Sequence, residues 1–234
     1  MAAPQQSAPR LRAAYWVTFG FFLLYIALAL LCLRQWSSPR PWQHVDAIVA
    51  AFFVISFAWM LQSLDFHKVV FHSKEMMQEA SGAGYDPWML RAFSFLPLLD
   101  LLVYYEYAHW QLTPALRQPL LHGLGLALAA GGVGWLWWTD RHLTRHFRGD
   151  TARRSVIHTG PYRWVRHPRY LGLLIWRAAF ALAFASPLAW MFSLPWLAMI
   201  LRRIRLEEAH LHGIFGPAYA EYSKHTSRLL PRVF

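Results

Sequence analysis

The chain has 234 residues, of which 56% are hydrophobic and only 15% are charged, against about 25% charged in a typical globular protein. This composition excludes a disordered, collagenous or coiled-coil chain, and it leaves too little polar surface for a soluble nucleic-acid-binding protein despite a formal net charge of +11. The single cysteine, Cys32, excludes an intramolecular disulfide framework and a cysteine-rich metal site. We therefore expect an integral membrane protein.

Six hydrophobic segments follow one another along the chain, and each predicts a helix. A helix needs about 20 mostly apolar residues to cross a bilayer. The first four segments cover residues 13–33, 45–64, 88–110 and 119–138. The last two share the apolar stretch 170–201, which is divided near Ser186-Pro187 and predicts a tight helical hairpin. The predicted fold is an all-α membrane bundle of about six transmembrane segments with a C-terminal hairpin.

The basic charge lies mainly in the second half of the chain. Residues 1–139 carry 8 Lys and Arg against 7 Asp and Glu, whereas residues 140–234 carry 15 against 5. The positive-inside rule then predicts that the loop before the hairpin and the C-terminal tail are cytoplasmic, and six crossings bring the N-terminus to the same side. The first hydrophobic run is too long for a cleaved signal peptide. A strong excess of Arg over Lys favours a bacterial inner membrane, with the endoplasmic reticulum as the alternative.

Small and charged residues inside the hydrophobic segments predict helix contacts. Gly123, Ala127 and Gly131 are spaced four apart, a pattern that lets membrane helices approach closely. Asp100 and Arg177 are ionisable groups within hydrophobic segments and are candidates for a special role. We interpret Arg177 as structural, within reach of the membrane interface, and leave the role of Asp100 open.

The densest polar chemistry lies in residues 153–170, just before the hairpin. Gly160-Pro161 predicts a turn, and Pro168 predicts the first turn of a helix, whose free N–H groups can receive a carboxylate. Arg166 and Arg169 flank that helix start, so a small anionic or zwitterionic ligand would fit there. A basic loop that contacts lipid headgroups explains the same charges and remains an alternative.

A second polar cluster lies at the end of the last hydrophobic segment. Arg203 and Glu207 are four residues apart and therefore share a helix face. Two further spacings, His142 with His146 and Glu207 with His210, leave a membrane di-iron oxygenase as a remote alternative. A third histidine motif is missing from the sequence, so we expect no metal site.

Four motifs in order resemble one family of enzymes. The segment 159–172, Thr-Gly-Pro-Tyr-Arg-Trp-Val-Arg-His-Pro-Arg-Tyr-Leu-Gly, resembles the hallmark of the isoprenylcysteine carboxyl methyltransferases and their phospholipid methyltransferase relatives. The likeness continues, after the hairpin, through Arg203 and residues 207–211, 215–222 and 228–231. It covers about 80 residues of the C-terminal region.

The resemblance implies a fold, a cofactor and a site. Residues 1–139 would form N-terminal transmembrane helices on the acceptor side, and residues 140–234 a methyltransferase-like region with a cofactor pocket at the cytoplasmic face. The cofactor would be S-adenosylmethionine, and Arg203 would position the methyl acceptor. The implied cofactor-binding residues are Ser155, Val156, Ile157, Tyr162, His167, Pro168, Arg169, Tyr170 and Glu207.

The acceptor implied by the resemblance is lipophilic and is either a small molecule or a lipidated chain. A prenylcysteine-like carboxylate is the first choice, and a phospholipid amine or a small thiol is the alternative. The C-terminal pattern is also related to that of membrane sterol reductases, which use NADPH. Here Gly-Pro-Tyr at residues 160–162 and the Glu207-Glu208 pair favour methyl transfer over reduction. The sequence does not determine the oligomeric state.

Overall fold

The computed structural model describes residues 8–70, 87–147 and 155–230, in which the secondary structure is helical except for loops, turns and one isolated bridge. The long helices are α1 (Ala8–Leu33), α2 (Ala47–Val70), α4 (Pro87–Tyr105), α5 (Pro119–Phe147), α6 (Pro168–Ala183) and α7 (Pro187–Phe215). Shorter elements are η1 (Glu106–Trp110), η2 (Pro114–Leu116), η4 (Gly160–Arg163) and α8 (Pro217–His225). The all-α prediction is confirmed, and each of the six hydrophobic segments forms a helix.

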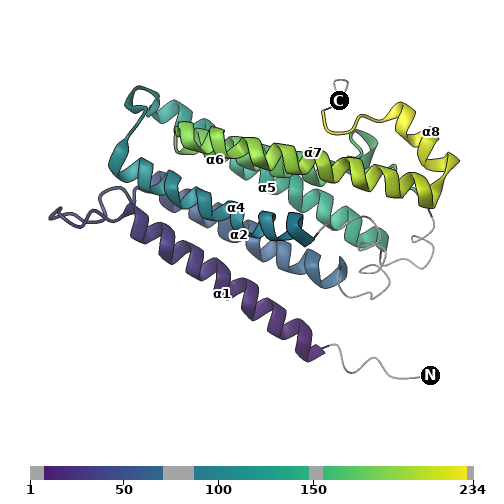
Figure 1. Ribbon diagram of the computed structural model, residues 1–234, viewed down its shortest axis with the longest axis horizontal. Helices are drawn as coiled ribbons and strands as arrows, with labels where there is room; N and C mark the ends of the chain where they lie inside the picture. Colours follow the sequence, from purple (N-terminus) through teal and green to yellow (C-terminus); the bar gives the residue numbers. More distant parts are fainter. Residues whose placement is uncertain (1–7, 71–86, 148–154, 231–234) are drawn as a thin grey trace.

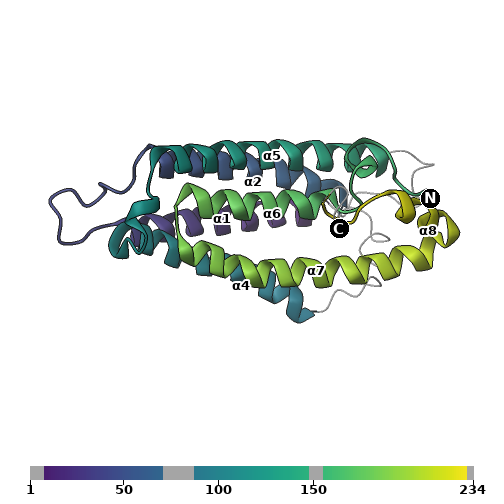
Figure 2. The same cartoon turned by 90° about the horizontal axis from the view of Figure 1, so that it is seen from above.

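The six long helices lie side by side along the long axis of the molecule (Figures 1 and 2). α5 packs along α6 and α2, α4 packs against α1 and α7, and α6 and α7 form the predicted hairpin. α7 continues to Phe215, well beyond the apolar segment that ends at Leu201. This extension carries the polar residues of α7 to the end of the bundle where α8 lies (Figure 2).

Aromatic side chains fill the centre of the bundle. Phe52 of α2 meets Trp176 and Phe180 of α6, with ring centroids 4.8 and 5.3 Å apart. Tyr104 of α4 contacts Phe180 and Phe184 edge-on. The aromatic contacts therefore join three helices that come from distant parts of the chain.

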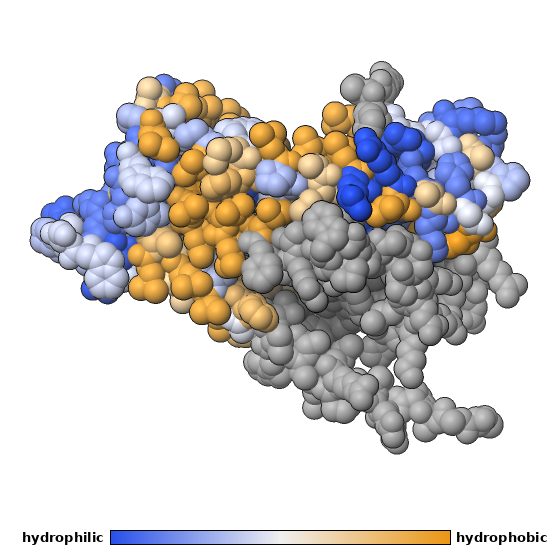
Figure 3. Space-filling model, in the orientation of Figure 1, coloured by the Kyte–Doolittle hydropathy of each residue, from blue (hydrophilic) through white to orange (hydrophobic). Residues whose placement is uncertain are grey.

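The outer surface is largely apolar. Large hydrophobic side chains are exposed on several helices, among them Phe21, Val54, Leu120 and Leu194. On the face drawn in Figure 3, hydrophobic residues cover the middle and hydrophilic residues gather toward the two ends. Among the described side chains, the helical stretch Pro119–His146 is long and apolar enough to span a membrane, and Phe19–Leu33 and Ala47–Leu61 are shorter apolar helices.

The close approach of α5 and α6 differs from the one that the small-residue spacing predicts. A Cβ atom at Gly125 would lie 2.3 Å from the backbone nitrogen of Ala183, whereas Gly123 and Gly131 have no such neighbour within 4 Å. The prediction that Gly123, Ala127 and Gly131 form the contact is therefore wrong. Gly125 and Gly132 face α6, and the predicted stripe faces outward, because one helix can bury only one side against its neighbour.

A buried ion pair joins α4 to α6. Nη1 of Arg177 lies 2.9 and 2.7 Å from the two carboxylate oxygens of Asp100, and both residues are buried. The interpretation of Arg177 as structural agrees with this contact, but its expected position near the interface is wrong, because its guanidinium turns inward to the carboxylate. The pair gives Asp100 a partner from the opposite half of the chain.

Candidate functional site

The site is built around the first turn of α6. Gly160 has a φ of +59°, which permits the predicted turn, and a Cβ atom at this position would lie 2.7 Å from the His142 ring. η4 follows this turn, and Pro168 is the first residue of α6, as predicted. The indole Nε1 of Trp135 donates to the carbonyl of Pro168 at 2.7 Å and thereby attaches α5 to the start of α6.

The C-terminal segment lies alongside the residues that precede α6. Val165 and Ser227 form a parallel bridge. The amide of Arg166 donates to the Ser227 carbonyl at 2.8 Å, and the amide of His167 donates to the Arg228 carbonyl at 3.1 Å. These bonds hold the chain end beside the predicted site residues.

Glu207 of α7 accepts hydrogen bonds from side chains of two helices, α7 and α6. Its Oε1 accepts from Nε of Arg203 at 2.8 Å and from the Tyr170 hydroxyl at 2.5 Å. Its Oε2 lies 3.6 Å from Nδ1 of His167. The structure therefore brings together four predicted site residues, Arg203, Glu207, Tyr170 and His167, which we call the Glu207 cluster.

Glu208 forms a second centre that the sequence did not predict as a binding residue. Its Oε1 lies 2.8 Å from Nη1 of Arg166 and 3.3 Å from Nε2 of His167. Its Oε2 accepts from Nε of Arg228 at 2.9 Å. Glu208 thus joins α7 to the start of α6 and to the C-terminal segment. The adjacent acidic pair in the sequence was the available signal, but its partners lie in other segments.

The electrostatics of the two carboxylates and the imidazole favour charged forms. Burial lowers the pKa of His167, but the hydrogen bonds and charges of Glu207 and Glu208 outweigh it, so the pKa is raised above 6.5. Burial raises the pKa of Glu207, but the bond from His167 and the charge of Arg203 outweigh it, so the pKa is lowered below 4.5. The pKa of Glu208 is lowered in the same way by His167 and Arg166.

An open pocket of about 710 Å³ lies between residues 155–163 and α8. This volume is within the range of about 300–1,000 Å³ that is typical of small-molecule sites. Ser155 and Val156 line it, as do Phe215, Ala218 and Tyr222. The Tyr222 hydroxyl donates to the carbonyl of Tyr162 at 2.6 Å, and its ring centroid lies 5.8 Å from that of Tyr219. The four residues of the Glu207 cluster do not line this pocket, and Tyr222 connects the pocket to the backbone of Tyr162.

Three predicted cofactor residues belong neither to the pocket lining nor to the Glu207 cluster. Ile157 is half-buried and does not line the pocket. Pro168 is buried in the first turn of α6. Nε of Arg169 donates to Oδ1 of Asp140, on α5, at 3.1 Å. These positions support the loop and the helix start on which the other predicted residues lie.

The histidines of the two spacings, His142 and His210, lie in different parts of the structure. Nε2 of His142 lies 3.0 Å from the hydroxyl of Thr159. His210 is partly exposed on α7. Within the part of the chain that the structure describes, no group of three or more His, Cys, Asp or Glu side chains could hold a metal ion.

Residues 120–218 match the family model described as phospholipid methyltransferase. This region, 99 of the 234 residues, is similar to the phospholipid methyltransferases. The matched residues include α5, the α6–α7 hairpin, the Glu207 cluster and the beginning of α8.

Curated proteins to which the chain is similar include protein-S-isoprenylcysteine and thiol methyltransferases. A probable protein-S-isoprenylcysteine O-methyltransferase of Oryza sativa is 35% identical over 80 residues, which cover 34% of this chain and 42% of the relative. The protein-S-isoprenylcysteine O-methyltransferase of Schizosaccharomyces pombe is 35% identical over 81 residues, 33% of this chain and 34% of the relative. Methanethiol S-methyltransferase 2 of Bradyrhizobium diazoefficiens is 28% identical over 170 residues, 65% of this chain and 64% of the relative. The chain thus spans less than half the length of the isoprenylcysteine relatives and just under two thirds of the thiol relative.

Proposed function

We propose that the protein is an integral-membrane methyltransferase that uses S-adenosylmethionine and acts on a lipophilic acceptor. The observation that carries the proposal is the Glu207 cluster, which lies within the region that matches the family model, together with a pocket of about 710 Å³ in the same C-terminal part of the chain. The protein thus has a small-molecule pocket and a group of side chains whose charged forms are stabilised by their hydrogen-bond partners. This combination favours a binding site over a purely structural contact.

The residues present fit the chemistry of S-adenosylmethionine. Glu207 offers a carboxylate for an ammonium or ribose hydroxyl, and the start of α6 offers N–H groups for a carboxylate. Tyr222 and Phe215 present aromatic surface to the pocket, which suits an adenine ring or a sulfonium cation. Ser155 and Val156 also line the pocket.

When bound, the cofactor would supply an electrophilic methyl group. The contribution of the protein is then mainly to align the acceptor with that group and to exclude water, because a carboxylate or thiolate acceptor needs no proton removed. Arg203 is the residue that we assign to the acceptor. Its guanidinium is oriented by Glu207 and by the Tyr170 hydroxyl, 3.3 Å from Nε.

For the acceptor we propose a prenylcysteine-like carboxylate. Two of the relatives described above carry this activity in their names, and Arg203 offers a guanidinium that can bind a carboxylate. A small thiol is the second candidate, because the relative with the longest alignment described here is a methanethiol methyltransferase. A phospholipid amine would in addition need a base to remove a proton.

We also propose that all six long helices cross the membrane and that both chain ends face the cytoplasm. The exposed apolar side chains on several of these helices and the basic loop and tail support this topology. The Arg-rich composition favours a bacterial inner membrane. The pocket and the Glu207 cluster would then face the cytoplasm.

Calorimetric titration of the purified protein with S-adenosylmethionine tests the proposal, with Glu207→Gln as the key variant. We expect the wild type to bind S-adenosylmethionine. Glu207→Gln should bind it about tenfold or more weakly because a charged hydrogen-bond partner is lost, and Arg203→Gln should bind it nearly as well as the wild type.

In a radiolabelled methyl-transfer screen of prenylcysteine analogues, thiols and lipids, Arg203→Gln should lose turnover. Arg205→Gln, exposed on the same helix, is the matched control. Binding of NADPH in place of S-adenosylmethionine would contradict the proposal.

A further inference from the structure

Three tryptophans gather where α5 meets the segment before α6. The rings of Trp135 and Trp164 are stacked with centroids 6.2 Å apart, and Trp138 meets them edge-on at 5.5 and 5.8 Å. Trp164 is 53% exposed and Trp138 is 38% exposed. We call these three residues the tryptophan cluster. It presents a large aromatic surface outside the protein core.

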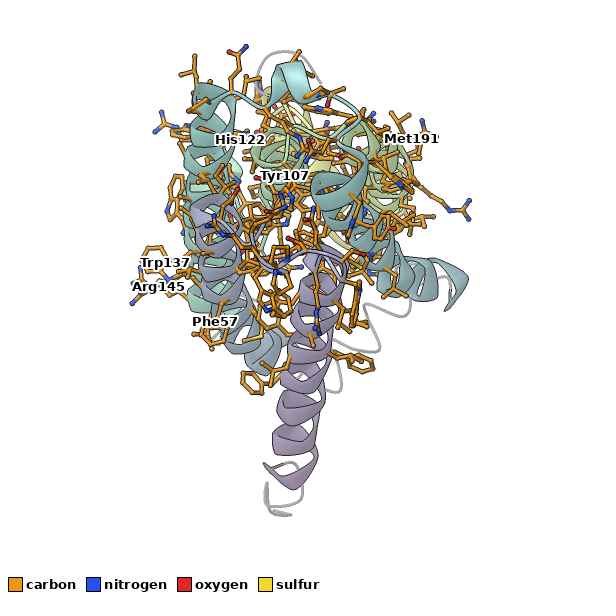
Figure 4. The ribbon with its side chains drawn as sticks, turned by 90° about the vertical axis from the view of Figure 1, so that its left-hand side faces the viewer. Phe57, Tyr107, His122, Trp137, Arg145 and Met191 are labelled. Carbon is orange, nitrogen blue, oxygen red and sulfur yellow. The ribbon has the colours of Figure 1, made fainter. Side chains whose placement is uncertain are left out.

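The outward face of α5 changes character as it approaches this cluster. Leu120, Leu124, Gly131, Trp138 and Arg145 are all exposed and, at 100° per residue, lie within about 60° of one another around the helix. The face therefore changes from aliphatic to aromatic to basic in chain order. In Figure 4, Trp137 and Arg145 point away from the bundle on the side where Phe57 of α2 also points outward.

The length of the apolar part matches the thickness of a bilayer. From Leu120 to Trp138 the helix rises about 27 Å at 1.5 Å per residue, close to the hydrocarbon thickness of about 30 Å. Tryptophan side chains are enriched at the boundary between hydrocarbon and water. The cluster lies where α5 would leave the hydrocarbon region.

Basic groups continue beyond the tryptophans. The guanidinium of Arg141 lies 4.8 Å from the centre of the Trp137 ring, and Arg141, Arg145 and Arg163 are all exposed. The acidic residue of this turn, Asp140, is buried and paired with Arg169. The exposed charge next to the cluster is therefore positive and suits anionic headgroups, each such arginine contributing about 1 kcal/mol near an acidic membrane surface.

We propose that the tryptophan cluster, together with Arg141 and Arg145, is a docking surface for the headgroups of acidic phospholipids. The inference rests on the membrane part of the proposed function and deepens it, because it fixes the depth of the site. Trp135 bonds to the Pro168 carbonyl, and Trp164 precedes His167 by three residues, so the docking surface holds the start of α6 at headgroup level. A lipid-borne acceptor would then reach the Glu207 cluster from the leaflet whose headgroups are bound.

Spin labels at exposed positions of α5 test the depth, with Trp137 chosen because it contacts Arg141 of the docking surface. In a Cys32→Ser background, single cysteines at Leu124, Gly131, Trp137 and Arg145 are labelled in the full chain and placed in vesicles of phosphatidylcholine and phosphatidylglycerol. We expect the labels at 124 and 131 to be reached by oxygen but not by a water-soluble nickel chelate. The label at 137 should be reached by both reagents, and the label at 145 mainly by the chelate.

The outcomes separate this inference from the proposed function. Chelate access at 124 and 131 would overturn the membrane embedding and the docking surface together. Lipid exposure at 124 with the label at 137 closed to both reagents would overturn the docking surface alone, because a protein contact such as a second copy would then cover it.

Lipid selectivity provides the second test. The association of spin-labelled phosphatidylglycerol with the protein, relative to phosphatidylcholine, should fall by up to about fivefold for each of Arg141→Gln and Arg145→Gln. Arg40→Gln, exposed in the segment that joins α1 to α2 at the end of the bundle away from α8, is the matched control and should leave the ratio unchanged. Unchanged selectivity in the double variant of Arg141 and Arg145 would overturn the proposal.

Discussion

At the scale of single residues, His167 connects the two carboxylates of the site. Its Nδ1 faces Glu207 and its Nε2 faces Glu208, so both ring nitrogens point at anionic oxygens. This arrangement favours the doubly protonated imidazolium, which donates from both nitrogens. The charge of His167 should therefore couple the stability of the site to pH.

We predict that His167→Gln destabilises the protein most at pH values below about 6.5. Because the folded pKa of His167 is raised, its stabilising contribution is fully present below the unfolded pKa and is lost as the pH rises through the folded value. The melting temperatures of the wild type and the variant in detergent, measured across this range, should converge at alkaline pH. His210→Gln, partly exposed on α7, should show no such convergence, and a constant difference for His167→Gln would contradict the prediction.

The residue scale also separates what sequence spacing can predict from what it cannot. Arg203 and Glu207 meet because residues four apart on a helix share a face, and this contact was predicted. Glu208 meets Arg166 and Arg228, which lie in two other segments, and no local spacing indicates such contacts. The second carboxylate of the site was therefore missed.

At the scale of elements, the contact of α5 with α6 depends on one glycine. A side chain at Gly125 would meet the backbone of Ala183, which cannot move aside as a flexible side chain could. Periodicity in the sequence indicated that α5 has a small-residue face. It did not distinguish the face at Gly125 from the one at Gly123, because both carry small residues.

We predict that Gly125→Ala lowers the free energy of unfolding by about 1–3 kcal/mol, the usual cost of overpacking. Gly123→Ala is the matched control, because nothing lies within 4 Å of its added Cβ atom, and the higher helix propensity of Ala should make it neutral or slightly stabilising. Thermal unfolding in detergent measures both variants. Equal stability of the two would contradict this account of the interface.

The second element-scale contact is the ion pair of Asp100 and Arg177 between α4 and α6. Removal of one buried charge leaves the other without its counterion, so Arg177→Met should cost about 3–5 kcal/mol. The double variant Asp100→Leu with Arg177→Met should recover most of that loss, since replacement of both charges by apolar groups is often neutral or stabilising. A double-mutant cycle of melting temperatures measures the coupling, and additive effects of the two substitutions would contradict it.

At the scale of the whole molecule, the C-terminal segment closes the site. Ser227 and Arg228 bond to the backbone before α6, and Leu229 packs with Ile200 and Ile204 of α7. Residues 227–229 thus contact the start of α6 and the side of α7. Residues 227–229 therefore contribute backbone and side-chain contacts to the surroundings of the site.

We predict that removal of residues 226–234 speeds hydrogen exchange at the amides of Arg166 and His167, because their acceptors are the Ser227 and Arg228 carbonyls. Exchange measured by mass spectrometry should rise about tenfold or more at these amides, and affinity for S-adenosylmethionine should fall with it. Peptides from the middle of α5 should keep their protection and serve as the internal control. Unchanged exchange at residues 166–167 would contradict the closing role of the segment.

The sequence alone determined the helical architecture, the hairpin, the helix start at Pro168 and the region of the site, because hydrophobic periodicity, proline and glycine act locally. The C-terminal motifs carried the resemblance to a methyltransferase family, whose model matches the same region. Only the tertiary structure decided which face of α5 packs on α6, that Asp100 pairs with Arg177, and that Glu208 holds the chain end against α6. These contacts join segments that are distant in the chain, and their energies depend on burial and geometry that no local pattern contains.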